Sequence, residues 1–226
     1  MCSNFYPTYS QQGLSLFTVD VQQDWVSPID KMHVFNHYPA PIVRLCLEDG
    51  NAVLQLLKAE FGLLPAWSKE RKLKFATMNA RSETVGSRPT FCGAWSRGQK
   101  CIIPADAIVE PDWRSGRHIP AHIARADGKP MGIAGLWDLW KDRHSGERVF
   151  SFTMLTINAD KHEVMQHFHK PNDEKRMVVI LDEADYHAWL SAPVATNHQF
   201  MQAYPASKLN VMHAPPLSNT MDDLFA

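Results

Sequence analysis

Short apolar runs separated by turn sequences constrain the fold of this chain more than any other feature. Residues 41–47 (PIVRLCL) and 52–57 (AVLQLL) flank the tetrapeptide EDGN, and this arrangement predicts a β-hairpin. Fifteen prolines are spread through the 226 residues, which indicates many turns and short elements. The sequence therefore favours short strands joined by turns.

Further apolar segments extend this pattern. Four of them are short and rich in Ile, Val, Phe and Trp, and they are predicted strands: 101–103, 119–124, 131–137 and 149–157. The tetrapeptide ADGK between the second and third of them predicts another hairpin. RMVVIL at 176–181 has the composition of a buried strand.

Helices are expected to be few. DEADYHAWL at 182–190 combines an acidic start with apolar residues at helical spacing. A second helix is predicted over 159–168 and a third near 10–24. Many short strands with a few helices predict a single α+β domain with a mostly antiparallel sheet.

Composition narrows the class of protein. The chain is 45% apolar and 21% charged, as in an ordinary soluble globular protein. It has no apolar run of about 18 residues, and its first residues lack the pattern of a secretory signal. The four cysteines lie far apart with no CxxC pair, which disfavours a zinc ribbon or a disulfide framework. A cytoplasmic, nucleoid-associated protein is the expectation.

The charge is unevenly distributed, although the formal net charge is only −1. Residues 65–129 carry twelve basic and six acidic side chains, whereas both flanking regions are acidic. A basic middle region suggests a local anionic partner. The alternative is a set of solvated Lys and Arg side chains scattered over several loops.

Cys2 has chemistry that no internal cysteine has, provided that Met1 is removed. Its α-amine and thiol then belong to one residue, with reference pKa values of about 7.7–8.0 and 8.5. The amine can condense with an aldehyde to an imine, and the thiol can add to the imine carbon to close a thiazolidine. The thiolate alone could also act as an acyl-transfer nucleophile. The alternative is an incidental second residue.

The segment 65–89 interleaves basic and aromatic side chains. Its polar residues include Trp67, Arg71, Lys72, Lys74, Asn79, Arg81 and Ser82. Such a mixture suits single-stranded nucleic acid, because cations neutralise phosphates and rings stack on unpaired bases. The alternative is a surface loop that carries a half-buried Trp.

Two further residues are candidates for proton transfer. Glu110 follows an apolar run, where a buried carboxylate could act as a general acid or base. His169 precedes Lys170-Pro171 and is expected in a turn, as a proton shuttle or as a structural residue. The histidines around it lack the partners of a known zinc motif, so we expect neither a metal nor a cofactor.

Taken in order, these segments resemble the SRAP family of SOS response-associated peptidase-like proteins. The matching segments are Cys2, Asn36 in NHYP, FGLLPAW at 61–67, NARSET at 79–84, CIIPADAIVE at 101–110, and FHKP with RMVVIL at 168–181. NARSET combined with Cys2 is highly specific, and the resemblance runs from residue 1 to about 190.

The resemblance implies a fold and an activity. The fold is a single α+β domain, a curved, mostly antiparallel, barrel-like sheet with a few flanking helices, over residues 1–217, followed by an exposed tail at 218–226. The activity is recognition of abasic sites in single-stranded DNA during DNA repair, with a thiazolidine crosslink through Cys2 that shields the lesion. Lyase or peptidase (hydrolase) chemistry accompanies this activity in the family.

The resemblance also implies roles for individual residues. Cys2 is the nucleophile, and Asn79 holds the reacting sugar or the Cys2 amine. Glu110 transfers protons during imine formation and crosslink reversal, and His169 assists opening of the sugar ring. The resemblance places Asn36 and Trp67 along the DNA groove and Arg81 on a phosphate, and Arg71, Lys72, Lys74 and Ser82 of the basic segment are expected to bind DNA as well.

The chain departs from the family pattern at three places. Ser3-Asn4 stands where the family has Gly-Arg, which removes one phosphate contact. Pro111-Asp112 follows Glu110 where a Trp is usual, and KPNDEK after His169 is slightly longer than usual. His167 is the alternative to His169 as the catalytic histidine.

Two other functions remain open at this stage. The first is a cysteine-type (auto)peptidase that uses the Cys2 thiolate with His169 or Glu110, and the second is a single-stranded DNA-binding module without a covalent step. MDDLF at 221–225 also resembles the short peptides by which bacterial repair proteins bind the sliding clamp, the alternative being a tail with no partner.

Overall fold

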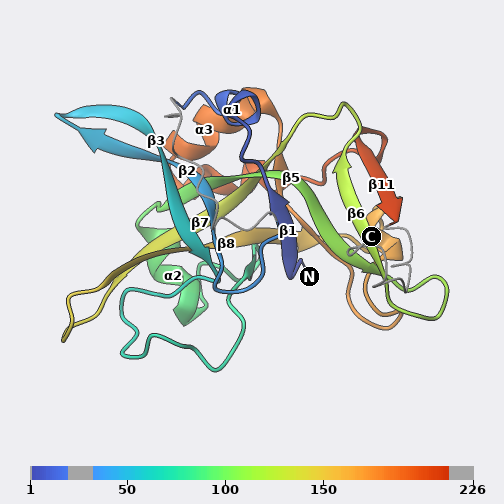
Figure 1. The fold of residues 1–226 in the computed structure, drawn as a ribbon, viewed down its shortest axis with the longest axis horizontal. Coiled ribbons are helices and arrows are strands. Elements are labelled where there is room, and N and C mark those ends of the chain that lie inside the picture. The colour runs from blue at the N-terminus through green and yellow to red at the C-terminus, as the bar shows by residue number, and fades with distance from the viewer. Residues whose placement is uncertain (1, 20–32, 214–226) are drawn as a thin grey trace, which may run out of the picture.

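The structure is a computed structural model, and it describes residues 2–19 and 33–213 (Figure 1). The predicted boundary at 217, the tail at 218–226 and its clamp-binding segment lie outside the described residues. Within these, the strands are β1 (Asn4–Pro7), β2 (Pro39–Glu48), β3 (Asn51–Phe61), β4 (Asn79–Arg81), β5 (Lys100–Asp112), β6 (Ile119–Arg125), β7 (Met131–Lys141), β8 (Arg148–Asn158), β9 (Arg176–Val178), β10 (Ile180–Leu181) and β11 (Leu209–His213).

These strands form one curved sheet that nearly closes on itself. Along the sheet, β7, β8, β3, β2 and β5 are neighbours in that order, and β5 also pairs with β7, so that the five strands complete a ring. The pairings are antiparallel except that β3 and β4 each run parallel to β8. The predicted α+β fold with a mostly antiparallel, barrel-like sheet is confirmed.

The hairpin predicted around EDGN is formed by β2 and β3, which project from the body at the left of Figure 1. Both turn residues have positive φ, 50° at Asp49 and 81° at Gly50. Such a turn matches the right-handed twist of the flanking strands. Because Gly, Asn and Asp tolerate positive φ, the local sequence sets this hairpin without help from distant contacts.

The second predicted hairpin is wrong. The segments 119–124 and 131–137 are strands, β6 and β7, but they do not pair with each other. β6 pairs with the second half of β5, at 108–112, and β7 with its first half, at 100–105. Since both are antiparallel to β5, they run in the same direction, and an antiparallel hairpin between them is excluded. The ADGK loop carries the chain from one half of β5 to the other.

The helices are short. They are α1 (Gln11–Ser15), α2 (Pro89–Ser96) and α3 (Tyr186–Ser191), of which α2 was not predicted. The predicted helix over 159–168 is wrong, because this segment holds turns and a single 3₁₀ turn at Met165–His167. The segment 176–181 is buried as predicted, but β9 pairs with β8 and β10 with β7. No helix among the described residues is long and apolar enough to cross a membrane.

Three phenylalanine rings fasten β1 to the ring of strands. Phe5 lies edge-on to Phe61 and Phe152, with centroids 5.2 and 6.3 Å away, and all three side chains are fully buried. Phe61 belongs to β3 and Phe152 to β8. Burial of these rings therefore fixes the strand that directly follows Cys2.

Truncation of the Phe5 side chain is expected to destabilise the protein strongly. Phe5→Ala should lower the free energy of unfolding by about 3–5 kcal/mol, because it removes a buried ring and leaves a cavity. The control is Leu47→Ala near the hairpin tip, where the side chain is 77% exposed and the change should stay within about 0.5 kcal/mol. Urea unfolding monitored by circular dichroism measures both. Equal effects of the two substitutions would contradict this view of the core.

Candidate active site

Cys2 lies beside strand β5 because β1 pairs with that strand. The register places Asn4 opposite Val109, one residue before Glu110. The Cys2 side chain is 1% exposed, and its thiol donates a hydrogen bond to the carbonyl oxygen of Asn4 at 3.2 Å. Burial, and then the nearby Glu110 carboxylate, raise the pKa of the Cys2 thiol well above its usual range. The thiol is therefore neutral at physiological pH.

Asn79 holds the main chain of Cys2. Strand β4 runs parallel to β8, with Asn79 opposite Met154, and this pairing brings NARSET to the barrel. The Asn79 Nδ2 donates a hydrogen bond to the Cys2 carbonyl oxygen at 2.6 Å. Its Oδ1 is buried and accepts no hydrogen bond from the part of the chain that the structure describes. Asn79 thus positions Cys2 and keeps one acceptor for a further donor.

Glu110 and His169 form a buried pair. His169 Nε2 lies 2.8 Å from Glu110 Oε2, and the two side chains are 8% and 1% exposed. His169 has a φ of 64°, and its backbone N–H donates to the carbonyl oxygen of Pro111 at 2.9 Å. β5 therefore supplies both the carboxylate and the anchor of the turn that carries the imidazole. His167, the alternative histidine, is exposed.

The departure at Asp112 does not leave an unbalanced charge beside Glu110. Two nitrogens of Arg114 bind the Asp112 carboxylate, at 2.6–3.1 Å, and His213 Nε2 lies 2.8 Å from it. The Arg114 guanidinium holds the pKa of Asp112 well below its usual range. The Asp112 carboxylate is thus ionised and paired with Arg114, two residues further along the chain.

A cavity of about 290 Å³ opens beside the buried pair. Glu110 and His169 form part of its wall. Its other lining residues are Ser3, Asn4, Val109, Pro111, Trp113, His118, Lys170 and Asp173. The indole of Trp113 stacks on His118, and Lys170 Nζ lies 5.8 Å from its ring centroid. Aromatic and cationic groups therefore lie next to the Glu110–His169 pair.

A larger cavity of about 550 Å³ lies on the Asn79 side of the cluster. Asn79 and Arg81 of NARSET line it, together with the exposed rings of Trp67 and Phe75. The other lining residues are Ala76, Thr84, Arg88, Pro89, Thr90 and Phe91. The Trp67 indole N–H donates to the carbonyl oxygen of Pro89 at 3.0 Å, which fixes the ring at the rim. Rings and guanidinium groups thus share one groove.

The remaining sequence-predicted residues line neither cavity. Arg71 is paired with Glu60 at 2.6 Å, and Lys72 and Lys74 are exposed on the same loop. The backbone N–H of Ser82 donates to the carbonyl oxygen of Thr156. A Cβ added at Gly62 would lie 2.3 Å from the Asn36 Oδ1, so Asn36 packs against the main chain after β3.

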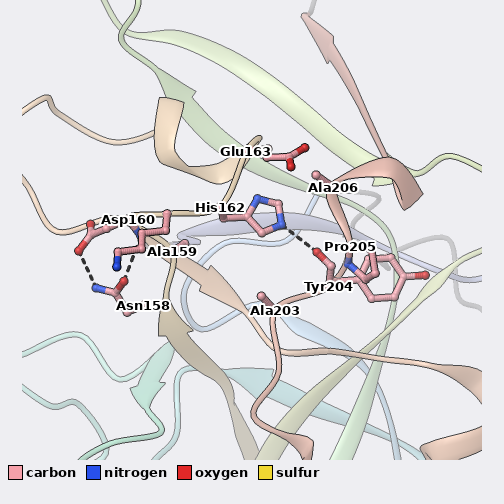
Figure 2. A pocket seen from close by; sticks show the side chains of 10 residues that line it. Asn158, Ala159, Asp160, His162, Glu163, Ala203, Tyr204, Pro205 and Ala206 are labelled. Atoms are coloured by element: carbon pink, nitrogen blue, oxygen red, sulfur yellow. Dashed lines mark hydrogen bonds between the residues drawn. The ribbon is translucent and has the colours of Figure 1, made fainter.

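A third pocket, of about 430 Å³, contains none of the predicted site residues (Figure 2). In it, His162 Nε2 hydrogen-bonds the carbonyl oxygen of Tyr204 at 2.8 Å. The His162 Nδ1 accepts the backbone N–H groups of Val164 and Met165. Nδ1 therefore holds the turn within the loop before His169, and Nε2 fastens that loop to the C-terminal segment, so both ring nitrogens of His162 have structural partners.

Several residues of the two cavities were missed by sequence reasoning. Phe75 and Arg88 lie in the basic and aromatic segment already recognised, so the same signal could have included them. Trp113 lies three residues after Glu110, displaced from the usual aromatic position. The Glu110–His169 contact joins residues far apart in sequence, and no local pattern indicates it.

The fold and this cluster together define a class of protein: a barrel-like α+β domain with a buried cysteine, glutamate and histidine and a partly buried asparagine gathered next to the first strand. The sequence matches the SOS response associated peptidase (SRAP) family over residues 1–222, and the chain belongs to that family.

Similar proteins support this assignment. A Bacillus subtilis (strain 168) protein named abasic site processing protein YoaM is 29% identical over 193 residues, which cover 82% of this chain and 79% of that protein. The Gallus gallus abasic site processing protein HMCES is 27% identical over 68% of this chain and 51% of its own length. The crystal structure of a Bordetella bronchiseptica protein covers 95% of this chain at 38% identity, with a TM-score of 0.84.

The buried, neutral thiol leads to a prediction about reactivity. The thiolate is the form that iodoacetamide alkylates, so Cys2 should react at least about tenfold more slowly than the half-exposed Cys46 at pH 7.5. Mass spectrometry of peptides after timed labelling measures both rates in one sample. The difference should disappear in urea. Equal rates in the folded protein would contradict the burial of the Cys2 thiol.

Proposed function

We propose that this protein acts on abasic sites in single-stranded DNA and joins them covalently through Cys2 after Met1 has been removed. The observation that carries this proposal is the grouping of Cys2 with Asn79, Glu110 and His169 at one end of the barrel. Its relatives YoaM and HMCES are named abasic site processing proteins, which supports the choice of substrate.

The proposed reaction uses both groups of an N-terminal Cys2. The amine attacks the aldehyde carbon of the ring-opened deoxyribose, and loss of one water molecule gives an imine. The thiol then adds across the C=N bond: sulfur bonds to carbon, and its proton passes to nitrogen. The product is a thiazolidine, and water is the only other product. The thiol proton reaches the imine nitrogen first, so that the sulfur attacks as the thiolate on the more electrophilic iminium carbon.

The neighbouring residues suit three tasks in this sequence. Asn79 holds the Cys2 carbonyl and so fixes the main chain of the residue that carries the amine and the thiol. Glu110 can take a proton from the attacking amine and return it to the departing hydroxyl. His169, 2.8 Å from Glu110, can take part in proton transfer when the sugar ring opens.

The two cavities give the DNA strand a route past this cluster. The larger cavity offers exposed rings for base stacking and the Arg81 and Arg88 guanidinium groups for phosphates. The smaller one adjoins Glu110 and His169 and offers Trp113 and Lys170. A strand lying along both would run past the neighbours of Cys2, since Ser3 and Asn4 line the smaller cavity and Asn79, which bonds the Cys2 carbonyl, lines the larger one.

The raised pKa of the Cys2 thiol argues against the peptidase alternative. Acyl transfer by cysteine requires the thiolate, and burial beside Glu110 disfavours that form. Imine formation requires only the neutral amine. The chemistry of the site therefore favours aldehyde capture over hydrolysis of a peptide bond.

The covalent step is tested on a denaturing gel. Protein whose N-terminus is shown by mass spectrometry to be Cys2 should give a shifted band with single-stranded DNA that carries one abasic site, and none with undamaged DNA. Cys2→Ala should abolish the band but keep non-covalent binding, and Cys92→Ala, a half-exposed thiol elsewhere, should keep both. A band that survives in Cys2→Ala would point to a lysine imine, and peptide turnover without a band would favour the peptidase.

The proton-transfer pair is tested by isosteric substitutions. Glu110→Gln should slow crosslinking by about 10²–10⁴-fold, the usual contribution of a general acid or base. His169→Asn should also slow it, and asparagine tolerates the positive φ at this position. The matched control is His167→Asn, on the exposed 3₁₀ turn two residues earlier. Rates come from quenched time courses, and a slower His167→Asn with an unaffected His169→Asn would reverse the assignment.

A further inference from the structure

Glu174 pairs with the arginine of NARSET. Its Oε2 lies 2.5 Å from the Arg81 Nη1, and the two side chains are 34% and 46% exposed. Glu174 belongs to the six-residue segment 170–175 (KPNDEK) between His169 and Arg176. This contact joins that segment to the groove that Arg81 lines.

The other oxygen of Glu174 is held independently. Oε1 accepts from the Arg176 Nη1 at 2.8 Å and from the Asn158 Nδ2 at 3.2 Å. Arg176 is 2% exposed and is also bound by Glu83, so this anchor is part of the core. Arg176, Asn158 and Arg81 lower the pKa of Glu174 to about 2, and its carboxylate is charged at neutral pH. A fixed anion thus stands beside Arg81.

We propose that Glu174 is a specificity-determining residue that weakens the binding of undamaged single-stranded DNA. Its carboxylate occupies the Arg81 guanidinium, so a DNA phosphate must displace Glu174 before it can bind Arg81. This inference rests on the proposed function, because Arg81 faces a DNA strand only if the groove binds one.

The geometry allows this exchange without leaving a buried charge unpaired. When Arg81 turns to a phosphate, Glu174 keeps both partners of its Oε1, and only Oε2 passes into water. The contact given up is a partly exposed ion pair, which contributes little to stability. The need to break this ion pair therefore lowers the affinity for DNA by a modest factor, and it does not prevent DNA from binding in the groove.

The consequence is that undamaged DNA stays bound for a shorter time than DNA that carries an abasic site. Undamaged DNA gains only the non-covalent contacts and must displace Glu174 to obtain the one with Arg81. An abasic site is held by the bond to Cys2, so a weak non-covalent step is no obstacle there. Asp173, which lines the smaller cavity, adds a second negative charge on the same segment.

The test is the affinity of Glu174→Gln for an undamaged single-stranded oligonucleotide. The glutamine oxygen can still accept from Arg176 and Asn158, but its amide does not attract Arg81. Fluorescence anisotropy should show binding about two- to fivefold tighter than wild type, the range expected for one exposed ion pair. Glu174→Ala should act in the same direction, and thermal unfolding confirms that each variant is folded.

Two controls separate the contact from net charge. Asp182→Asn removes the same charge from a carboxylate that pairs with Lys208, and it should leave affinity near the wild-type value. In an Arg81→Ala background, Glu174→Gln should have no effect on affinity, because the guanidinium is already gone.

Each other outcome overturns the inference. Weaker binding by folded Glu174→Gln would mean that Glu174 positions Arg81 for DNA, and an equal gain in Asp182→Asn would reduce the effect to net charge. These results are independent of the covalent step, since the oligonucleotide has no lesion. If the wild-type protein crosslinks abasic DNA but Glu174→Gln binds undamaged DNA with the wild-type affinity, only this inference is overturned. If the wild-type protein binds no DNA at all, the proposed function is overturned as well.

Discussion

Pairing along strand β5 places the groups of the candidate site. β1 pairs with its middle and carries Cys2 towards Glu110, while the carbonyl of Pro111 holds the His169 turn. β2 and β7 pair with its first half and close the ring of strands, so β5 cannot shift without breaking the barrel. A change of register by one residue would turn Glu110 to the opposite face. The reactive cluster is therefore as rigid as the sheet itself.

A buried cation ties the second half of the site to this frame. Arg176 lies almost fully out of water, which is costly for a charged group unless its donors are paired. Glu83 of NARSET, Glu174 and the carbonyl oxygen of Thr156 accept from it. NARSET therefore keeps its place by two routes, the pairing of β4 with β8 and this ion pair. Asn79 and Arg81 project from a segment that is fixed at both ends.

Local patterns in the sequence predicted local structure well. The EDGN hairpin follows from turn residues that tolerate positive φ, and the apolar runs became strands near their predicted positions. The ADGK hairpin prediction was wrong because β6 and β7 each pair with β5 and not with one another. Which strands pair is decided by tertiary contacts that the local sequence does not show. The helix over 159–168 is not formed, and in its place the His162 Nδ1 accepts the backbone N–H groups of a turn while its Nε2 bonds the carbonyl oxygen of Tyr204. Cys2, Glu110 and His169 were candidates from their own chemistry and Asn79 took its role from the family resemblance, whereas the Arg81–Glu174 pair joins positions too distant for any sequence spacing to reveal.

The protonation state of Cys2 connects the fold to the order of the proposed chemistry. A residue placed between β5 and β4 is removed from water, and a thiol that is removed from water beside a carboxylate stays protonated. Such a thiol is a poor first nucleophile, whereas a neutral amine loses little reactivity there. The amine would therefore react first and the sulfur second, on an imine that becomes a stronger electrophile than the aldehyde once its nitrogen takes the thiol proton. Burial, which makes the cysteine unsuitable for hydrolysis, is thus compatible with ring closure to a thiazolidine.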